Sequence, residues 1–421
     1  MSGKGTERPQ GVAAYIAVTV AYWSFMLTDG ALRMLVLLHF HTLGFSPVQL
    51  AYLFVLYEVA GIVTNLSAGW IAARFGLTST LYAGLGIQIL ALAALSRLDP
   101  GWTLWGSVAF VMAVQGASGV AKDLAKMSSK SAVKLLAPTE AGGLFRWVAL
   151  LTGSKNAVKG LGFFLGALLL GGLGFVPSLV LMAVMLAAIL IAVAVFMPSG
   201  LPRGLKGAKF RQVLSNNPRI NLLSAARLFL FGARDVWFVV GIPVYFYAVL
   251  SDGSQAGDRA AFYLIGGFMA VWIMLYGAVQ ALAPKILHAA QRSDAEIRDA
   301  ASRWVAALAL IPFSLALVVA IAPGPSGPLT GVVVLGLLLF GFVFAVNSSL
   351  HSYLILAFTG AERVTFDVGF YYMANASGRL LGTVLSGVSY QIGGLAGCLV
   401  VAGALALMSF GFASRLRHLE T

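Results

Sequence analysis

The chain has 421 residues, of which 59% are hydrophobic and only 10% are charged, and its mean hydropathy is +0.90. These values exclude an ordinary soluble domain and indicate an integral membrane protein. The single cysteine, Cys398, excludes an intrachain disulfide and a four-cysteine metal site. The formal net charge of +13 is better explained by loops that face anionic lipids than by nucleic-acid binding.

Twelve apolar runs have the length of about 20 residues that a membrane-spanning helix needs. Six lie near residues 12–38, 47–70, 77–96, 102–125, 143–172 and 177–197, and six more near 220–249, 260–282, 304–322, 329–357, 366–390 and 394–414. The stretch 198–219 between the two sets contains five cations and no acid. We therefore predict an N-terminal six-helix half over 1–197, a basic cytoplasmic central loop over 198–219 and a C-terminal six-helix half over 220–421.

The cations between the runs fall mainly on one side of the membrane. If both termini are cytoplasmic, only Arg97 and Arg259 lie on the outer side. By the positive-inside rule we expect both termini in the cytoplasm. The first run is too long for a signal-peptide core and no small-residue cleavage pattern follows it, so we expect it to remain as a span.

The two halves echo each other weakly, as an internal repeat would. Asn156-Ala157 in the fifth run corresponds to Asn375-Ala376 in the eleventh, and Asp29 in the first corresponds to Asp235 in the seventh. This correspondence indicates two related six-helix units.

The segment 69–76, Gly-Trp-Ile-Ala-Ala-Arg-Phe-Gly, resembles the signature of the major facilitator superfamily, and Gln115-Gly116 resembles part of its span-four motif. The resemblance implies an all-α integral membrane fold, with twelve transmembrane helices in two six-helix halves around a central cavity. Ala73 stands where the signature has an aspartate, and Met112 where span four usually has an arginine. The superfamily's usual charge latch and span-four arginine are therefore not expected here.

Ionisable residues inside the spans point to the chemistry of the substrate. A charge at the centre of a bilayer costs about 2.5 to 3.5 kcal/mol on insertion scales, so unpaired cations need a wet cavity and a bound anion. The acids inside spans are Asp29, Glu58 and Asp235, with Asp367 at a span edge. The cations are more numerous: Arg33, Lys155, Lys159, Arg227, Arg234 and Arg379. We therefore expect a small, multiply charged anionic substrate.

Four lysines recur at every fourth residue near the end of the fourth run: Lys122, Lys126, Lys130 and Lys134. This spacing places them in one stripe along a helix face, where like charges repel unless anions visit them. Lys130 and Lys134 are interpreted as a topology signal at the inner surface. Lys122 and Lys126 are interpreted as vestibule residues that contact the substrate.

Lys155 and Lys159 lie one turn apart in the fifth run. Counted from residue 143, Lys155 is about 18 Å deep at 1.5 Å per residue, beyond easy snorkelling reach. We therefore predict that both lysines bind the substrate. Asn156, Tyr371 and Asn375 are candidate partners for neutral hydroxyl groups, although hydrogen bonds between helices explain them equally well.

Asp29 and Glu58 each have two interpretations. Asp29 lies four residues before Arg33, so the two either neutralise each other on one helix face or act in substrate or proton binding. Glu58 has no cation within four residues. It is either the structural partner of Arg33 or Arg379 or a proton-coupling site.

Arg234 and Asp235 are neighbours, about 100° apart around a helix, and are not expected to face each other. We predict that Arg234 faces the cavity. Arg227 lies two turns away and either binds the substrate or snorkels to the membrane interface. Asp235 joins Asp29 and Glu58 as a candidate coupling or gating residue.

Three longer segments, 119–134, 153–160 and 225–238, look like those of the ArsJ-type organoarsenical efflux permeases. The resemblance spans nearly the whole chain. It implies a monomer in the bacterial inner membrane that exports 1-arseno-3-phosphoglycerate, which glyceraldehyde-3-phosphate dehydrogenase forms from arsenate. This dehydrogenase would be a functional partner that supplies the substrate, and no metal or other cofactor is expected.

A three-carbon acid with an arsenate ester at one end and a phosphate at the other needs cations at two separated points. Lys155 and Lys159 can hold one end and Arg227 and Arg234 the other, with Arg33 and Arg379 lining the cavity. Three alternatives remain: transport of another small phosphorylated anion, a membrane enzyme, and a non-transporting sensor. The enzyme has little support, because the five histidines include no pair at metal-ligand spacing within one span and no Ser/His/Asp set is brought together. The sequence has no phosphate-cradling glycine loop, so transport is not expected to be driven directly by ATP.

Overall fold

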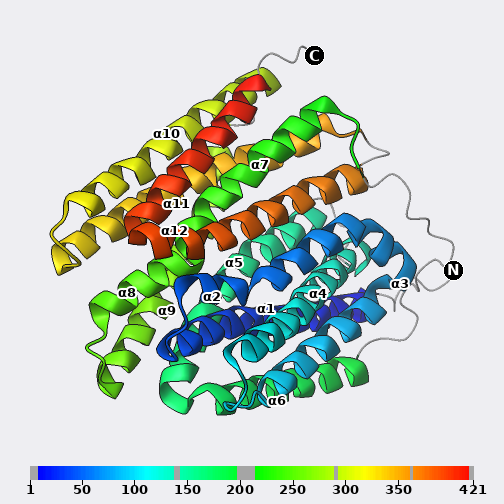
Figure 1. Cartoon of the computed structure of the whole chain (residues 1–421). Helices are drawn as coiled ribbons and strands as arrows, with labels where there is room; N and C mark the ends of the chain where they lie inside the picture. Colours follow the sequence, from blue (N-terminus) through cyan, green and yellow to red (C-terminus); the bar gives the residue numbers. More distant parts are fainter. Residues whose placement is uncertain (1–7, 137–142, 197–213, 289–292, 361–363, 417–421) are drawn as a thin grey trace, which may run out of the picture.

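The structure is a computed structural model that describes residues 8–136, 143–196, 214–288, 293–360 and 364–416. Every regular element within these ranges is helical. We call the first six elements the N-terminal half (Figure 1): α1 (Arg8–Thr42), α2 (Pro47–Tyr52), α3 (Val55–Leu95), α4 (Leu104–Leu136), α5 (Gly143–Leu173) and α6 (Phe175–Phe196).

The remaining elements form what we call the C-terminal half. They are α7 (Pro218–Val236), a π-helical turn η1 (Trp237–Gly241), α8 (Ile242–Leu250), α9 (Gln255–Ile286), α10 (Asp294–Ile321), α11 (Gly327–Phe358) and α12 (Val364–Arg415). In Figure 1, α7, α10 and α11 gather above α1, α4 and α6. The predicted central loop, 198–219, lies largely outside the described residues.

Two long helices each contain two of the predicted spans. The 52 residues of α12 would extend roughly 78 Å at 1.5 Å per residue, more than twice the hydrocarbon thickness of about 30 Å. The helix breaks at Gly393 and Gly394, and the positive φ of 56° at Gly394 favours glycine. Gly76, with φ 74°, divides α3 in the same way. The all-α fold predicted from the sequence, with twelve crossings, is confirmed.

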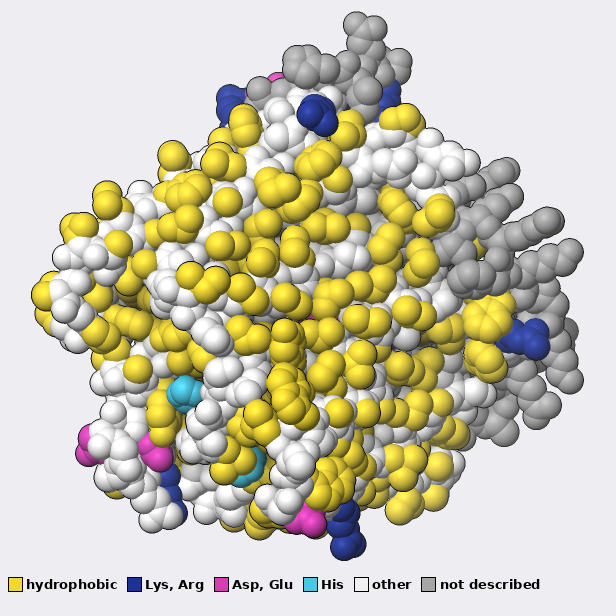
Figure 2. All heavy atoms as spheres, in the orientation of Figure 1, with side chains coloured by type: hydrophobic (Ala, Val, Ile, Leu, Met, Phe, Trp, Pro, Cys, Tyr) yellow, Lys and Arg dark blue, Asp and Glu magenta, His cyan; other side chains and the backbone are white. Residues whose placement is uncertain are grey.

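The surface fits a lipid environment. Eleven helical segments within the described residues are long and apolar enough to cross a membrane, and the last of them, Phe366–Arg415, contains both crossings of α12. Large apolar side chains such as Leu90 and Leu310 are exposed. Figure 2 shows hydrophobic side chains over most of the visible face, with charged side chains towards its margins. The chain is therefore a multi-pass membrane protein.

Close helix crossings join neighbouring elements. A Cβ at Gly166 of α5 would overlap the carbonyl oxygen of Ala31 in α1. A Cβ at Gly160 of α5 would lie 2.8 Å from the carbonyl oxygen of Ala270 in α9. Small residues let backbones approach in this way. Contacts between α5 and α9, and between α3 and α12, join the two halves.

The π-helical turn η1 interrupts the seventh span just after Asp235. A π-turn changes the register of the backbone hydrogen bonds. Ser386 of α12 compensates for this change: its Oγ accepts hydrogen bonds from the amides of Val240, at 3.1 Å, and Gly241, at 3.2 Å. The irregular turn is thereby fastened to α12.

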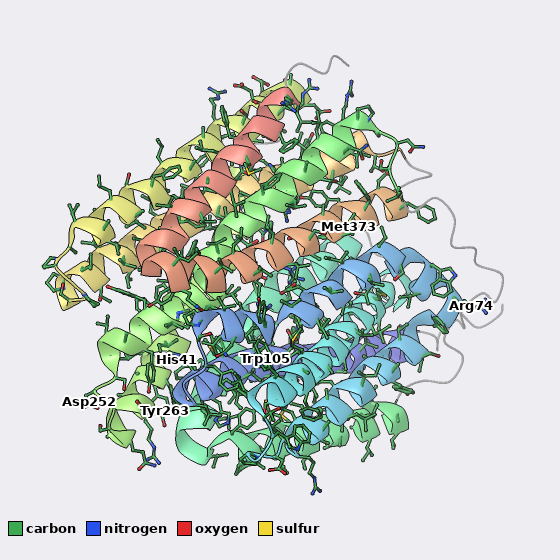
Figure 3. All side chains as sticks on the ribbon, viewed as in Figure 1. His41, Arg74, Trp105, Asp252, Tyr263 and Met373 are labelled. Atoms are coloured by element: carbon green, nitrogen blue, oxygen red, sulfur yellow. The ribbon has the colours of Figure 1, made fainter. Side chains whose placement is uncertain are left out.

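Figure 3 places Arg74 and Asp252 at opposite ends of the molecule. Arg74 belongs to the end predicted to be cytoplasmic, and Asp252 belongs to the loop before α9, which is predicted to be outside. This separation agrees with the predicted alternation of the connections between spans.

Candidate functional site

Glu58 lies at the boundary between the two halves and contacts two arginines. Its Oε1 is 3.4 Å from Nη1 of Arg33 in α1, and its Oε2 is 2.8 Å from Nη2 of Arg379 in α12. The carboxylate is fully buried, whereas the arginine side chains are 15% and 17% exposed. Glu58 thus contacts both of the arginines that the sequence analysis named as its possible partners.

Lys122 and Lys159 are the further cations whose charge acts on Glu58. We call Arg33, Glu58, Lys122, Lys159 and Arg379 the central charge cluster. Two of these cations, Arg33 and Arg379, contact Glu58 directly and come from different halves. Asp123 also acts electrostatically on Lys122 and Arg379, and Asp29 acts on Lys159, so several acids share these cations. Arginine and lysine side chains that converge in this way can bind an oxyanion.

Lys122 is buried, with 7% of its surface exposed. Its ammonium lies 4.1 Å from the centroid of the Tyr57 ring, within cation–π range. Its Nζ has no hydrogen-bond partner among the described residues. This donor is available to a ligand.

Lys126 differs from Lys122 because its charge is matched. Its Nζ lies 3.3 Å from Oδ1 of Asp123 and donates a hydrogen bond of 2.7 Å to Oδ1 of Asn65. Asp123 also accepts a hydrogen bond from Thr64. Sequence reasoning missed this role of Asp123, although its spacing of three residues from Lys126 was a usable signal. The side chains of Lys130 and Lys134 lie outside the described residues.

Asp29 does not pair with Arg33 within the described part of the chain. Its Oδ1 instead accepts a hydrogen bond of 2.7 Å from the hydroxyl group of Tyr57. The proposed neutralisation within α1 is therefore replaced by contacts with α3. Asp29 also acts electrostatically on Lys159. The two residues lie on helices that cross closely, because a Cβ added at Gly30 would lie 2.8 Å from the Lys159 carbonyl oxygen.

The polar residues of α5 contact different helices. Lys155 and Lys159 are half-buried, and Nζ of Lys159 lies 5.7 Å from the centroid of the Phe163 ring. Asn156 Nδ2 donates to Oε1 of Gln280 at 3.5 Å. Asn156 therefore takes part in a contact between the halves, in agreement with the structural interpretation of this residue.

Arg227 points into the C-terminal half. It is 4% exposed, and its Nη1 donates hydrogen bonds to the carbonyl oxygen and Oγ of Ser348, at 3.1 and 2.9 Å. Gln280 donates to the same Oγ at 3.3 Å. Asn156, Gln280, Ser348 and Arg227 thus form a connected path from α5 to α7. This burial excludes the interpretation that Arg227 snorkels to the interface.

The prediction that Arg234 and Asp235 do not face each other is wrong. Arg234 Nε lies 2.6 Å from Oδ1 of Asp235, and both side chains are largely buried. The long arginine side chain bends round the helix and so overcomes the angle between the two positions. The Arg234 guanidinium also packs near the rings of Phe231 and Phe344.

Tyr371 and Asn375 lie on α12. The Tyr371 ring is 1% exposed and lies 5.0 Å from the guanidinium carbon of Arg227. Asn375 Oδ1 is buried and has no hydrogen-bond partner among the described residues. Of these two predicted site residues, the structure brings Tyr371 next to Arg227.

A separate apolar cavity of about 390 Å³ is lined by Tyr52, Val55, Trp105, Val108, Ala109, Met112 and Val384. Met112 therefore belongs to an apolar wall rather than to the charged cluster. The described residues contain no group of three or more histidine, cysteine or acidic side chains that could hold a metal ion.

Comparison with known proteins gives matches among solved structures. A POT family transporter in complex with a thioalcohol-conjugated peptide superposes with a TM-score of 0.70, at 14% identity, over 95% of this chain and 96% of that one. The nucleoside transporter NupG superposes with a TM-score of 0.66, at 15% identity, over 96% of this chain and 98% of that one. A POT family transporter in complex with 5-aminolevulinic acid superposes with a TM-score of 0.67, at 14% identity, over 98% of both chains.

The chain therefore has the all-helical fold of these transporters. No family model and no curated protein matches it. The superpositions establish the fold, and at identities of 13 to 15% they leave the substrate to be inferred from the site. The central charge cluster lies where the two halves meet, because Glu58 of α3 contacts Arg379 of α12.

Proposed function

We propose that the chain is a secondary-active transporter that exports a small polyanion by alternating access. The observation that carries this proposal is the central charge cluster, in which cations of both halves converge on the single carboxylate of Glu58. Buried cations in a membrane protein mark substrate or ion pathways. Because α1, α3, α4 and α5 supply most of the cluster and α12 supplies Arg379, a bound anion would contact both moving halves.

The finer proposal is that the substrate is 1-arseno-3-phosphoglycerate. It rests on the resemblance of the three segments to the ArsJ-type permeases. The site supports it in one respect: the central charge cluster and Arg227 with Arg234 offer two cationic regions for the two ends of the substrate. Arsenate is an oxyanion, so its recognition requires the hard cationic donors found here rather than thiolates.

A second candidate is export or exchange of another small phosphorylated anion, such as a sugar phosphate, phosphoglycerate or inorganic phosphate. The same observation favours it, because arsenate and phosphate groups present equivalent oxygens to arginine and lysine. Only a flux measurement with both kinds of substrate distinguishes the two candidates.

Everted membrane vesicles provide that measurement. The dehydrogenase, glyceraldehyde-3-phosphate, its nucleotide cofactor and arsenate are supplied outside, so that the arseno-ester forms freshly at the cytoplasmic face. We expect arsenic to accumulate in vesicles that contain the chain only when the dehydrogenase is active. Accumulation of a phosphorylated anion without any of the arseno-ester would favour the second candidate, and no accumulation of either would refute the transport proposal.

We further propose that both termini are cytoplasmic, that the protein acts as a monomer in a bacterial inner membrane, and that residues 1–197 and 220–421 are the two moving units. Asp29, Glu58 and Asp235 remain the candidate coupling or gating residues. Single cysteines introduced into a Cys398-free variant, at residues 4 and 252, would report the sidedness of the two ends by labelling in intact cells.

A further inference from the structure

Glu58 occupies the position that an anionic ligand would take. Its two carboxylate oxygens each approach a different arginine, Arg33 at 3.4 Å and Arg379 at 2.8 Å. Carboxylate, phosphate and arsenate groups present the same kind of oxygen acceptor to a guanidinium group. The contacts that Glu58 makes are therefore the contacts that a substrate oxyanion would need.

Lys122 adds a donor that no side chain satisfies by a hydrogen bond. It is 7% exposed and acts electrostatically on both Asp123 and Glu58, but its Nζ has no hydrogen-bond partner among the described residues. A buried ammonium without an acceptor is unfavourable. A tetrahedral oxyanion offers more acceptor oxygens than a carboxylate, so it can satisfy Lys122 as well as the two arginines.

We propose that Glu58 is a tethered counter-anion, which holds the place of the substrate in the empty transporter and is displaced from Arg33 and Arg379 when the substrate binds. This inference rests on the proposed transport of a polyanion. It assigns Glu58 the role of an internal competitor, and it names the ligand class as a tetrahedral oxyanion with at least two free oxygens.

The placement of the three residues has a consequence for the transport cycle. Arg33 and Glu58 belong to the N-terminal half, and Arg379 belongs to the C-terminal half. In the empty protein Glu58 neutralises cations of both halves, so the unloaded transporter can reorient without burying bare positive charge. Without Glu58, only the loaded transporter retains that neutralisation.

The binding test uses the full-length chain in lipid nanodiscs, with inorganic phosphate and 3-phosphoglycerate as probes. Removing the competing charge in Glu58→Gln should lower the Kd for the probes about tenfold. The matched control is Asp367→Asn, which removes a buried carboxylate of α12 whose partner is Thr359. Asp367→Asn should leave the Kd for both probes within about twofold of the wild-type value.

A second variant, Glu58→Asp, keeps the test valid if Glu58→Gln does not fold. Glu58→Asp keeps the charge but is one methylene shorter, so it cannot reach both arginines as Glu58 does. It should also bind the probes more tightly than the wild type, by a smaller factor than Glu58→Gln. Unchanged or weaker binding in a correctly folded variant would overturn the inference.

The flux test separates net efflux from exchange. In vesicles, Glu58→Gln should lose net transport into empty vesicles while it still exchanges labelled for unlabelled substrate, so the ratio of net transport to exchange should fall well below that of the wild type. Net transport at the wild-type rate would overturn the inference while leaving the proposed function intact. Absence of both binding and flux in the wild type would instead refute the proposed function itself.

Discussion

The ammonium group of Lys122 lies 4.1 Å from the centroid of the Tyr57 ring, and the hydroxyl group of that ring donates a hydrogen bond of 2.7 Å to Asp29. One aromatic residue of α3 therefore contacts a cation of α4 and an acid of α1. The ring stabilises the Lys122 charge without accepting a hydrogen bond from it, and Nζ has no hydrogen-bond partner among the described residues.

The first prediction compares Lys122 with Lys126, one turn away. Lys122→Met should raise the melting temperature, by an amount equivalent to about 1 kcal/mol of unfolding free energy, because it removes a buried ammonium that has no hydrogen-bond acceptor among the described residues. Lys126→Met should lower the melting temperature, by an amount equivalent to about 3 kcal/mol, because it removes the cation that contacts the buried Asp123 carboxylate. Thermal unfolding of the purified variants measures both. Shifts of the same sign would contradict the distinction drawn between the two lysines.

Lys122→Met should also weaken the binding of inorganic phosphate about tenfold. The reason is that a charge-assisted hydrogen bond to the anion is lost while the packing of the side chain is kept. Titration calorimetry of the nanodisc-embedded protein measures the change. An unchanged affinity would remove Lys122 from the anion site.

The second prediction concerns the two lysines of α5. Lys155→Ala and Lys159→Ala should each abolish arsenate resistance in a sensitive host, because both are expected to bind the substrate. Lys285→Ala, which removes an exposed lysine at the end of α9, should keep full resistance. Growth on arsenate is scored together with the amount of protein in the membrane. Full resistance with either α5 variant would remove that lysine from the proposed site.

The third prediction tests the ion pair of Arg234 and Asp235. Asp235→Ala should destabilise the protein by about 3 kcal/mol, because the mostly buried Arg234 then lacks its acid. Combining it with Arg234→Met should recover much of this loss. A double-mutant cycle on unfolding measures the coupling between the two residues. Additive effects would show that the contact contributes no interaction energy.

The fourth prediction concerns the crossing of α1 and α5. Gly166→Val should lower stability by at least about 2 kcal/mol, because its side chain would overlap the Ala31 carbonyl group. Gly172→Ala on the same helix meets no atom within 4 Å. It should be neutral or stabilising by up to about 1 kcal/mol. Expression yield and melting temperature report both changes, and equal tolerance of the two substitutions would argue against the close crossing.

The spans were predictable because hydropathy is a local property of the chain. Runs of about 20 apolar residues marked each crossing, including the two in α3 and the two in α12. Gly76 and Gly393 fall between predicted spans, and Gly394 is the first residue of the last predicted span. The excess of cations inside the spans was also visible, since it requires only a count of charges.

The partners of those charges were harder to predict. Glu58 and Arg379 are far apart in sequence, and their contact depends on how α3 and α12 are rotated about their axes. In a membrane both the lipid-facing and the interior faces of a helix are largely apolar, so the sequence pattern fixes this rotation weakly. The partnership of Asp123 with Lys126 was missed for a different reason, because the spacing of three residues between them was not used. Arg234 and Asp235 were misjudged because helix geometry describes Cβ positions and not the reach of an arginine.

Ser386 fastens the π-helical turn of the seventh span to α12 by two hydrogen bonds. Backbone amides released inside a membrane must find a protein partner, because lipid offers none. The same two spans also pack closely, with Gly378 of α12 against the Leu228 carbonyl oxygen of α7. We therefore expect the helices that carry Arg227, Arg234 and Arg379 to move together relative to Glu58.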